Sequence, residues 1–179
     1  MKKATFALQP FSTNEDAARY NLGGMLRRYA GSLSVIFHLA GPIHLLRIPS
    51  MHPAPKRTQG LWKNTCFECF IGTPASAGYW EFNLAPSRHW NIYRFDGYRQ
   101  GMCREEAFDT LPIDLSLTQN TLQLALDIDL DRMNLSGRPI RLAISAVLVA
   151  KGGVKTYWAL THSANKPDFH HPDTFLLAL

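Results

Sequence analysis

Apolar and polar residues alternate along most of this chain. In the clearest run, residues 122–130, every second position is Leu or Ile and most positions between them are polar. Successive side chains of a β-strand point to opposite faces, so this run predicts a strand with one buried and one largely polar face. Residues 33–39 repeat the pattern, and Gly41-Pro42 then interrupts it. The period is that of strands rather than of helices.

The same pattern predicts about eleven or twelve short strands. They cover residues 5–8, 20–28, 33–39, 43–48, 61–71, 79–84, 90–95, 112–117, 122–130, 141–149, 154–160 and 175–179. Gly152-Gly153 is typical of a hairpin turn, and Ser136 to Pro139 mark another junction. Helical signals are short, at residues 14–19 and 104–108, and each predicts only a turn or two.

These elements favour an all-β fold: an antiparallel β-sandwich of jelly-roll or immunoglobulin-like type. No helices of crossover length separate the strands, which argues against a parallel α/β sheet. The chain has 179 residues, enough to bury roughly 70% of its unfolded surface. No long linker or internal repeat divides it, so we expect one domain over residues 1–179.

Composition changes this interpretation little. Apolar residues make up 46% and charged residues 18%, which excludes a disordered chain or a coiled coil. The net charge of +5 favours anionic partners slightly. Basic pairs are scattered and do not interleave with aromatics on one strand, so nucleic-acid binding is not expected. No apolar run is long enough to cross a membrane, and the short apolar run after Lys2-Lys3 ends at Gln9-Pro10; we expect a cytoplasmic protein.

Cys66 and Cys69 have the C-x-x-C spacing of redox and zinc sites. The segment has the pattern of a strand, on which residues three apart point to opposite faces. With three cysteines, an odd number, and no second pair, structural thiols in a reducing compartment are the favoured interpretation.

The segment 61–99 concentrates aromatic and polar residues. Alternation within 61–71 places Trp62 and Glu68 on one face, and within 79–84 it places Glu81 and Asn83 opposite the apolar Trp80 face. Two neighbouring strands would thus present Glu68, Glu81 and Asn83 on one surface, with Trp62 at its margin.

Such a mixture is suited to sugars. The apolar C–H faces of a pyranose stack on aromatic rings, while its hydroxyls need carboxylate, amide or guanidinium partners. Two other interpretations remain open: the aromatics fill a core while Glu68 pairs with Arg94 or Arg99, or Glu68 and Glu81 form the carboxylate pair of a glycosidase.

The C-terminal segment carries a second polar cluster, and two interpretations apply to it. His162, Asp168, His170, His171 and Asp173 could be read as metal ligands, but adjacent histidines diverge on an extended chain. We favour a fixed loop over residues 166–172 that folds over the aromatic face, with His162 and His170 donating hydrogen bonds and the loop supplying ligand contacts.

Three motifs together carry a family resemblance. LWKNTCFECF at 61–70, YWEFNLAPS at 79–87 with Trp90, Tyr93-Arg94-Phe95 and Tyr98-Arg99, and YWALTH at 157–162 with KPDFHH at 166–171 resemble an uncharacterised bacterial family of DOMON-like domains. The resemblance runs from about Leu33 onward. It implies an antiparallel β-sandwich related to family 9 carbohydrate-binding modules, whose wider group binds sugars or haem, and it implies no catalysis.

The family 9 modules have a Trp six residues before a Glu on one strand, which Trp62 and Glu68 match. Glu81 and Asn83 match two polar ligands of the next strand, although the modules place a basic residue where Glu81 stands. A second stacking aromatic comes late in those chains, where either Trp158 or Phe169 could serve. With Arg99 and the C-terminal loop, the expected ligand-binding residues are Trp62, Glu68, Glu81, Asn83, Arg99, Trp158, His162, Lys166, Asp168 and His170.

The resulting hypothesis is a non-catalytic module for a sugar or sugar derivative, with no cofactor expected. A haem or metal protein is one alternative, because haem-binding relatives use a Met and a His as axial ligands, and Met25, Met51, Met102, Met133 and seven histidines offer candidates by number. A domain that docks a protein partner, such as a cell-wall sugar enzyme, is the other.

Overall fold

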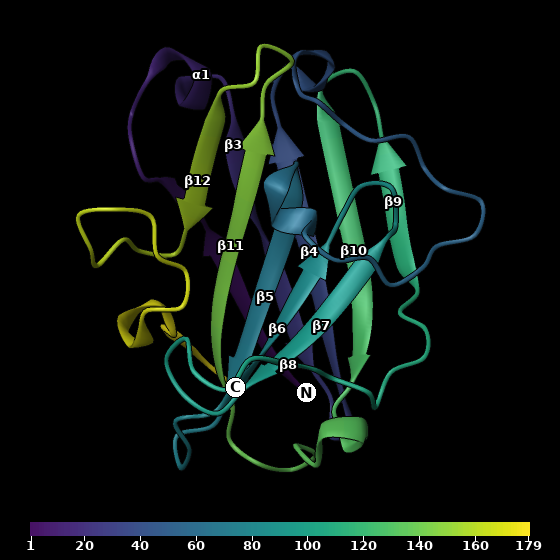
Figure 1. The fold of residues 1–179 in the computed structure, drawn as a ribbon, viewed down its shortest axis with the longest axis vertical. Coiled ribbons are helices and arrows are strands. Elements are labelled where there is room, and N and C mark those ends of the chain that lie inside the picture. The colour runs from purple at the N-terminus through teal and green to yellow at the C-terminus, as the bar shows by residue number, and fades with distance from the viewer.

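The computed structural model describes all residues from Met1 to Leu179, and they form two antiparallel sheets packed face to face (Figure 1). The first sheet holds, in spatial order, β1 (Lys2–Ala7), β3 (Asn21–Arg28), β4 (Ser32–Ala40), β10 (Thr121–Asp129) and β9 (Ile113–Leu117). The second holds β2 (Gln9–Pro10), β12 (Lys155–Ala159), β11 (Arg141–Val149), β5 (Cys66–Gly72), β6 (Tyr79–Leu84), β7 (Trp90–Phe95) and β8 (Cys103–Arg104), and β13 (Leu177–Ala178) pairs with β11.

The helical elements are all short. They are α1 (Glu15–Ala18) and four 3₁₀ turns: η1 (Ile43–Leu45), η2 (Leu61–Lys63), η3 (Asp131–Met133) and η4 (Pro172–Thr174). The side chain of Asn14 caps α1 by accepting a hydrogen bond from the Ala17 amide. None of these helices is long and apolar enough to cross a membrane. The predicted all-β sandwich is confirmed.

The core lies between the sheets and follows from the alternation. On β10, Leu122, Leu124, Leu126 and Ile128 are buried, and the Phe37 ring of β4 meets the Phe67 ring of β5 across the interface with centroids 5.2 Å apart. The polar positions of β10 face outward. Such interdigitation of two apolar faces holds a sandwich together.

The predicted hairpin at Gly152-Gly153 is confirmed. The Ala150 amide donates to the Val154 carbonyl, and Gly153 has a φ of +90°, which glycine adopts without the Cβ penalty. This turn joins β11 to β12.

Three predicted elements differ from the structure. Residues 43–48 form η1 and a single bridge from Leu46 to Ala150 rather than a strand, because Pro42 and the Gly41 turn carry the chain across the sandwich end. Residues 104–108 form no helical turn. The predicted strand 61–71 begins only at Cys66, because Gly60 has a left-handed φ of +73° and starts η2.

The two strand cysteines face opposite sides, as predicted. Cys69 lies in the inter-sheet core, whereas Cys66 packs with Leu61 and Ala85 on the outer side of β5. Both thiols are buried, and burial raises the pKa of each above its ordinary value.

Candidate functional site

The outer face of the second sheet carries the polar residues of the strand segment. Glu68 of β5 pairs in register with Asn83 of β6 and Ser145 of β11, and Glu81 lies two residues along β6 from Asn83. All four side chains therefore point away from the inter-sheet core. Glu68 is only 2% exposed and Glu81 only 5% exposed. These side chains are therefore buried by segments that lie over the outer face of this sheet, and not by the other sheet.

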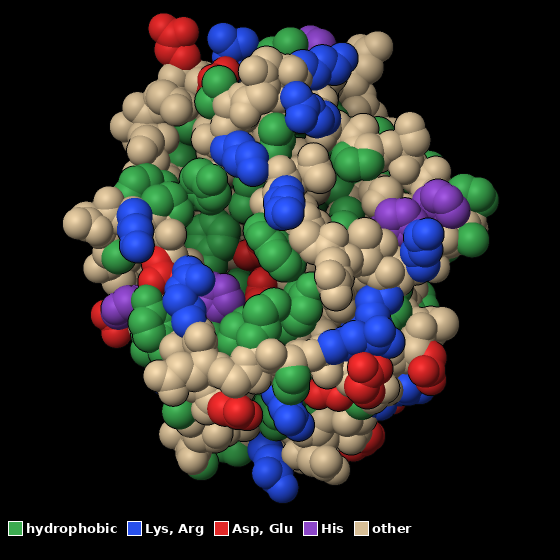
Figure 2. Space-filling model, viewed as in Figure 1, with side chains coloured by type: hydrophobic (Ala, Val, Ile, Leu, Met, Phe, Trp, Pro, Cys, Tyr) green, Lys and Arg blue, Asp and Glu red, His purple; other side chains and the backbone are tan.

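A cavity of about 420 Å³ lies over these carboxyl groups, within the range of about 300–1,000 Å³ of small-ligand sites. Figure 2 shows the hollow in the middle of this face, with acidic side chains at its depth, apolar side chains on its walls and basic side chains around it. It is lined by Trp62, Lys63, Glu68, Glu81, Phe95, Arg99, Met102, Val147, Lys155, Tyr157, Pro167, Phe169 and His170.

Each of the two carboxyl groups keeps one oxygen without a partner in the chain. Ser145 Oγ donates to Glu68 Oε2 over 3.0 Å, and Asn83 Nδ2 donates to Glu81 Oε1 over 2.9 Å. Glu68 Oε1 and Glu81 Oε2 accept no hydrogen bond from the protein. Neither oxygen is among the fully buried atoms that lack a partner, so both are reachable from the cavity and can accept a hydrogen bond from a molecule inside it.

The electrostatics of the pair follow from its surroundings. Burial, together with the neighbouring Glu81 carboxylate, raises the pKa of Glu68 above its ordinary value, against the hydrogen bond from Ser145. Burial also raises the pKa of Glu81, and the hydrogen bond from Asn83 and the charge of Arg99 offset this only in part. No cation bonds directly to either group. The pair therefore ionises reluctantly.

Trp62 lies beside the cavity because it belongs to a 3₁₀ turn, and not because of the alternation of a strand. The η2 turn, held by the Lys63 amide bonding to the Gly60 carbonyl, buries Leu61 against Cys66 and leaves Trp62 beside the cavity. Its ring meets Tyr93 edge-on with centroids 5.9 Å apart, and 37% of the residue remains exposed. Trp62 thus forms one aromatic wall.

Phe169 contributes to a second wall, together with Tyr157 of β12. The centroids of the two rings are 6.2 Å apart, and both residues line the cavity. Of the two late aromatics that the sequence left open, the structure brings Phe169 to the carboxyl groups.

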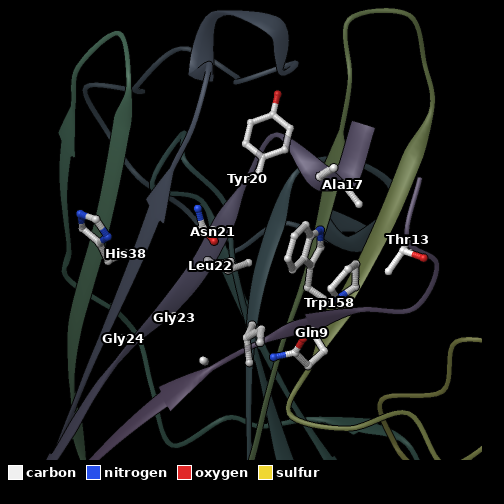
Figure 3. Close-up of a pocket in the computed structure, with 14 residues that line it drawn as sticks. Gln9, Thr13, Ala17, Tyr20, Asn21, Leu22, Gly23, Gly24, His38 and Trp158 are labelled. Carbon is white, nitrogen blue, oxygen red and sulfur yellow. The ribbon is translucent and has the colours of Figure 1, made fainter. Parts of the chain in front are cut away.

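Trp158 lies on the inner face of β12 and is 3% exposed. Its Nε1 donates to Thr156 Oγ1 over 2.9 Å. Figure 3 shows it among Gln9, Ala17 and Leu22, where it lines a different cavity of about 530 Å³ beside α1. Trp158 therefore does not belong to the pocket over Glu68 and Glu81.

The loop over residues 166–172 is fixed on the aromatic face, as the sequence predicted. The Asp168 carboxylate accepts hydrogen bonds from Tyr98 Oη, from Arg99 Nη2 over 2.7 Å and from the His170 amide over 3.2 Å. Burial alone would raise the pKa of Asp168, but the hydrogen bonds from Tyr98 and Arg99 and the Arg99 charge hold it below its ordinary value. Asp168 thus ties the loop to the β7–β8 connection.

His170 is the next anchor of this loop. Its Nδ1 shares a 2.8 Å hydrogen bond with Tyr79 Oη, and its ring packs edge-on against Phe70 and Phe95. Burial, assisted by the positive charge of Arg99, lowers the pKa of His170 to about 4. The imidazole is therefore neutral near pH 7.

The remaining predicted residues lie away from the cavity. His162 Nε2 bonds to the Gln9 carbonyl over 2.9 Å, and Lys166 is exposed on the loop without lining the cavity. Asn83 is fully buried behind Glu81 and contacts the site through that carboxyl group. No three His, Cys, Asp or Glu side chains gather in a way that could hold a metal ion.

Sequence reasoning missed several residues of the cavity, above all Tyr157, Lys155 and Lys63. The sequence does indicate the first two. A charged residue such as Lys155 is expected on the outer face of a strand, and residues two apart share a face, so Tyr157 also faces outward and Trp158 faces the core. Nothing in the sequence signalled Lys63, because its position depends on the η2 turn.

The fold and the pocket together define a β-sandwich with a small-ligand cavity on the outer face of one sheet. Several solved structures share the fold. A proposed carbohydrate-binding protein from Bacteroides uniformis is similar with a TM-score of 0.67 and 13% identity, covering 94% of this chain and 83% of its own. A family 9 carbohydrate-binding module from Caldicellulosiruptor kristjanssonii, solved with cellotriose, is similar with a TM-score of 0.52 and 12% identity, covering 87% and 71%.

At such low identities the likeness shows the fold alone. The chain therefore has the fold of family 9 carbohydrate-binding modules, as the sequence resemblance implied. No protein-family profile and no curated sequence matches the chain.

Proposed function

We propose that this protein is a non-catalytic binding module that holds a sugar or sugar derivative in the outer-face pocket. The observation that carries the proposal is the pair of buried carboxyl groups, Glu68 and Glu81, each with one oxygen free to accept a ligand hydroxyl at the floor of a cavity with aromatic walls. The resemblance to DOMON-like domains and the fold of the family 9 modules support the same conclusion.

In this proposal Trp62 and Phe169 face the apolar sides of a pyranose, while Glu68 and Glu81 bind its hydroxyls. Asn83 and Ser145 orient the two carboxyl groups, and Asp168 holds Arg99 and the loop that carries Phe169. A hydrogen bond to whichever of the two carboxyl groups is ionised would contribute about 1.5–3 kcal/mol before ordering costs.

The test is a thermal-shift screen of the purified protein against neutral, amino and acidic monosaccharides and their disaccharides. A ligand of the folded state raises the melting temperature in a saturable way. We expect at least one sugar to do so, and we expect Glu68→Gln to remove the shift. Asp127→Asn, an exposed carboxylate on the other sheet, is the matched control and should keep it. A flat screen at millimolar sugar would contradict the proposal.

Haem is the alternative with a specific observation behind it, because Met102 and His170 both line the cavity. However, the His170 ring is enclosed by Phe70 and Phe95 and its Nδ1 is engaged by Tyr79, so it offers poor access for axial ligation. Titration of the apoprotein with haemin distinguishes the two: a saturable Soret shift lost in Met102→Leu would favour haem.

A further inference from the structure

Three basic side chains line the same pocket above the carboxyl floor. Lys63 comes from η2, Lys155 from β12 and Arg99 from the β7–β8 connection. Arg99 is paired with Asp168, whereas neither lysine takes part in an ion pair. The rim therefore carries two cations that the protein does not neutralise.

The floor does not neutralise them either. Glu68 and Glu81 are buried, lie diagonally across neighbouring strands and repel each other when ionised, so the pair resists carrying its full negative charge. Asp168, the remaining acid near the cavity, already accepts two hydrogen bonds from Arg99. The balance of charge inside the pocket is consequently positive when the pair holds a proton.

Arg99 adds hydrogen-bond donors to the positive charge of the rim. Its Nε and Nη2 both bond to Asp168 Oδ1, and its Nη1 has no partner in the chain. Asp168 thus holds the guanidinium along one edge, and Arg99 lines the cavity. A guanidinium positioned in this way is suited to a carboxylate.

We propose, on the basis of the function proposed above, that the ligand is a saccharide with a negatively charged substituent, of the uronic acid class. Its hydroxyls contact Glu68 and Glu81, and its carboxylate faces Lys63, Lys155 and Arg99. The rim excludes a cationic amino sugar by the same charges, so the pocket selects for charge as well as for the shape of the ring.

The experiment compares glucose, glucuronate and glucosamine, which share a ring and differ in charge, by isothermal titration calorimetry. We expect glucuronate to bind about fivefold or more tightly than glucose at low salt, with the difference shrinking in 0.5 M NaCl, since exposed ion pairs are screened. Glucosamine should bind more weakly than glucose. The matching galactose series tests whether charge outweighs hydroxyl stereochemistry.

Two double variants assign the effect to the rim. Lys63→Gln with Lys155→Gln should lower the ratio of glucuronate to glucose affinity severalfold, with Arg99 carrying the preference that remains. Lys2→Gln with Lys3→Gln removes the same charge from exposed positions of β1 and should keep the preference. Equal binding of glucose and glucuronate, or tighter binding of glucosamine, overturns this inference while the sugar-binding function stands. Absence of binding by every sugar overturns both.

The pH dependence of glucuronate affinity tests the same inference independently. An anionic sugar binds best when the carboxyl pair holds its protons, so its affinity should fall as the pH rises through the pKa values of Glu68 and Glu81. The titratable groups packed beside them do not change charge in that range: the pKa of His170 lies near 4, and burial raises the pKa values of Tyr79, Tyr93 and Cys66. Affinity for glucuronate that rises with pH would contradict the inference.

Discussion

Two of the cavities on this molecule, of about 530 and 420 Å³, differ in the polar groups that they offer to a ligand. Beside α1, the Tyr20 hydroxyl donates to the Pro42 carbonyl and the Trp158 indole donates to Thr156, so these two polar groups of the cavity in Figure 3 already have partners within the chain. Over β5 and β6, Glu68 and Glu81 each retain a free oxygen. We therefore place the proposed ligand over Glu68 and Glu81, although this cavity is the smaller of the two.

The largest expected difference between the two cavities appears when the tryptophan of each is removed. Trp158→Ala empties part of the inter-sheet core, and we expect it to lower the free energy of unfolding by about 3–5 kcal/mol. Trp62→Ala removes a ring that is 37% exposed and should cost less than half as much. Urea denaturation measures both. Similar losses for the two variants would mean that Trp62 is also a core residue.

The next largest effect concerns the Asp168 anchor. Asp168→Ala leaves Tyr98 and Arg99 without their shared acceptor, and we expect unfolding to become easier by about 1–3 kcal/mol. Hydrogen exchange should increase mainly in residues 166–176. Glu106→Gln, which breaks the exposed pair with Arg104, is the control and should change little. Unchanged exchange in the loop after Asp168→Ala would show that the anchor is dispensable.

Trp62→Ala should also weaken sugar binding, by about fivefold to tenfold, because one stacking wall is lost. Thr13→Ala, at the rim of the cavity beside α1, should leave binding unchanged. Calorimetry with the best sugar from the screen compares the two. Weaker binding in Thr13→Ala together with unchanged binding in Trp62→Ala would place the ligand in the cavity beside α1.

The last expected effect is a pH dependence of stability. The pKa values of Glu68 and Glu81 are higher in the folded chain than the ordinary 4.5, so the folded state binds more protons and loses stability as the pH rises above about 4.5 through those values. Glu68→Gln removes one of these groups. Its stability relative to wild type should therefore increase by at least about 1 kcal/mol between acidic and alkaline pH, since a change of one in pKa corresponds to about 1.4 kcal/mol, as followed by thermal melting. A constant difference would show that Glu68 is ionised without penalty.

Much of the site was predictable because it lies on regular strands. Period-two alternation placed Glu68, Glu81 and Asn83 on one face, and the structure has them there. The same rule, applied to Lys155 and Tyr157, would have directed Trp158 into the core. The family resemblance pointed to Trp158 or Phe169 without deciding between them.

The rest depended on contacts that no local pattern encodes. Arg99 and Asp168 are 69 residues apart and lie in two loops, so their pairing follows from the packed fold alone. Trp62 and Lys63 reach the rim because Gly60 turns the chain into η2 instead of extending β5. Likewise, the predicted strand at 43–48 became η1 and one bridge, because its hydrophobic residues cover the end of the sandwich.

The most direct test of the central claim is a calorimetric titration of the best sugar from the screen into wild type, Glu68→Gln and Asp127→Asn at equal concentrations. We expect saturable one-site binding to wild type and to Asp127→Asn, and at least a tenfold loss in Glu68→Gln, which should still unfold in one cooperative transition above the titration temperature. Undiminished binding by Glu68→Gln would show that the buried carboxyl pair does not hold the ligand, and the account would be wrong.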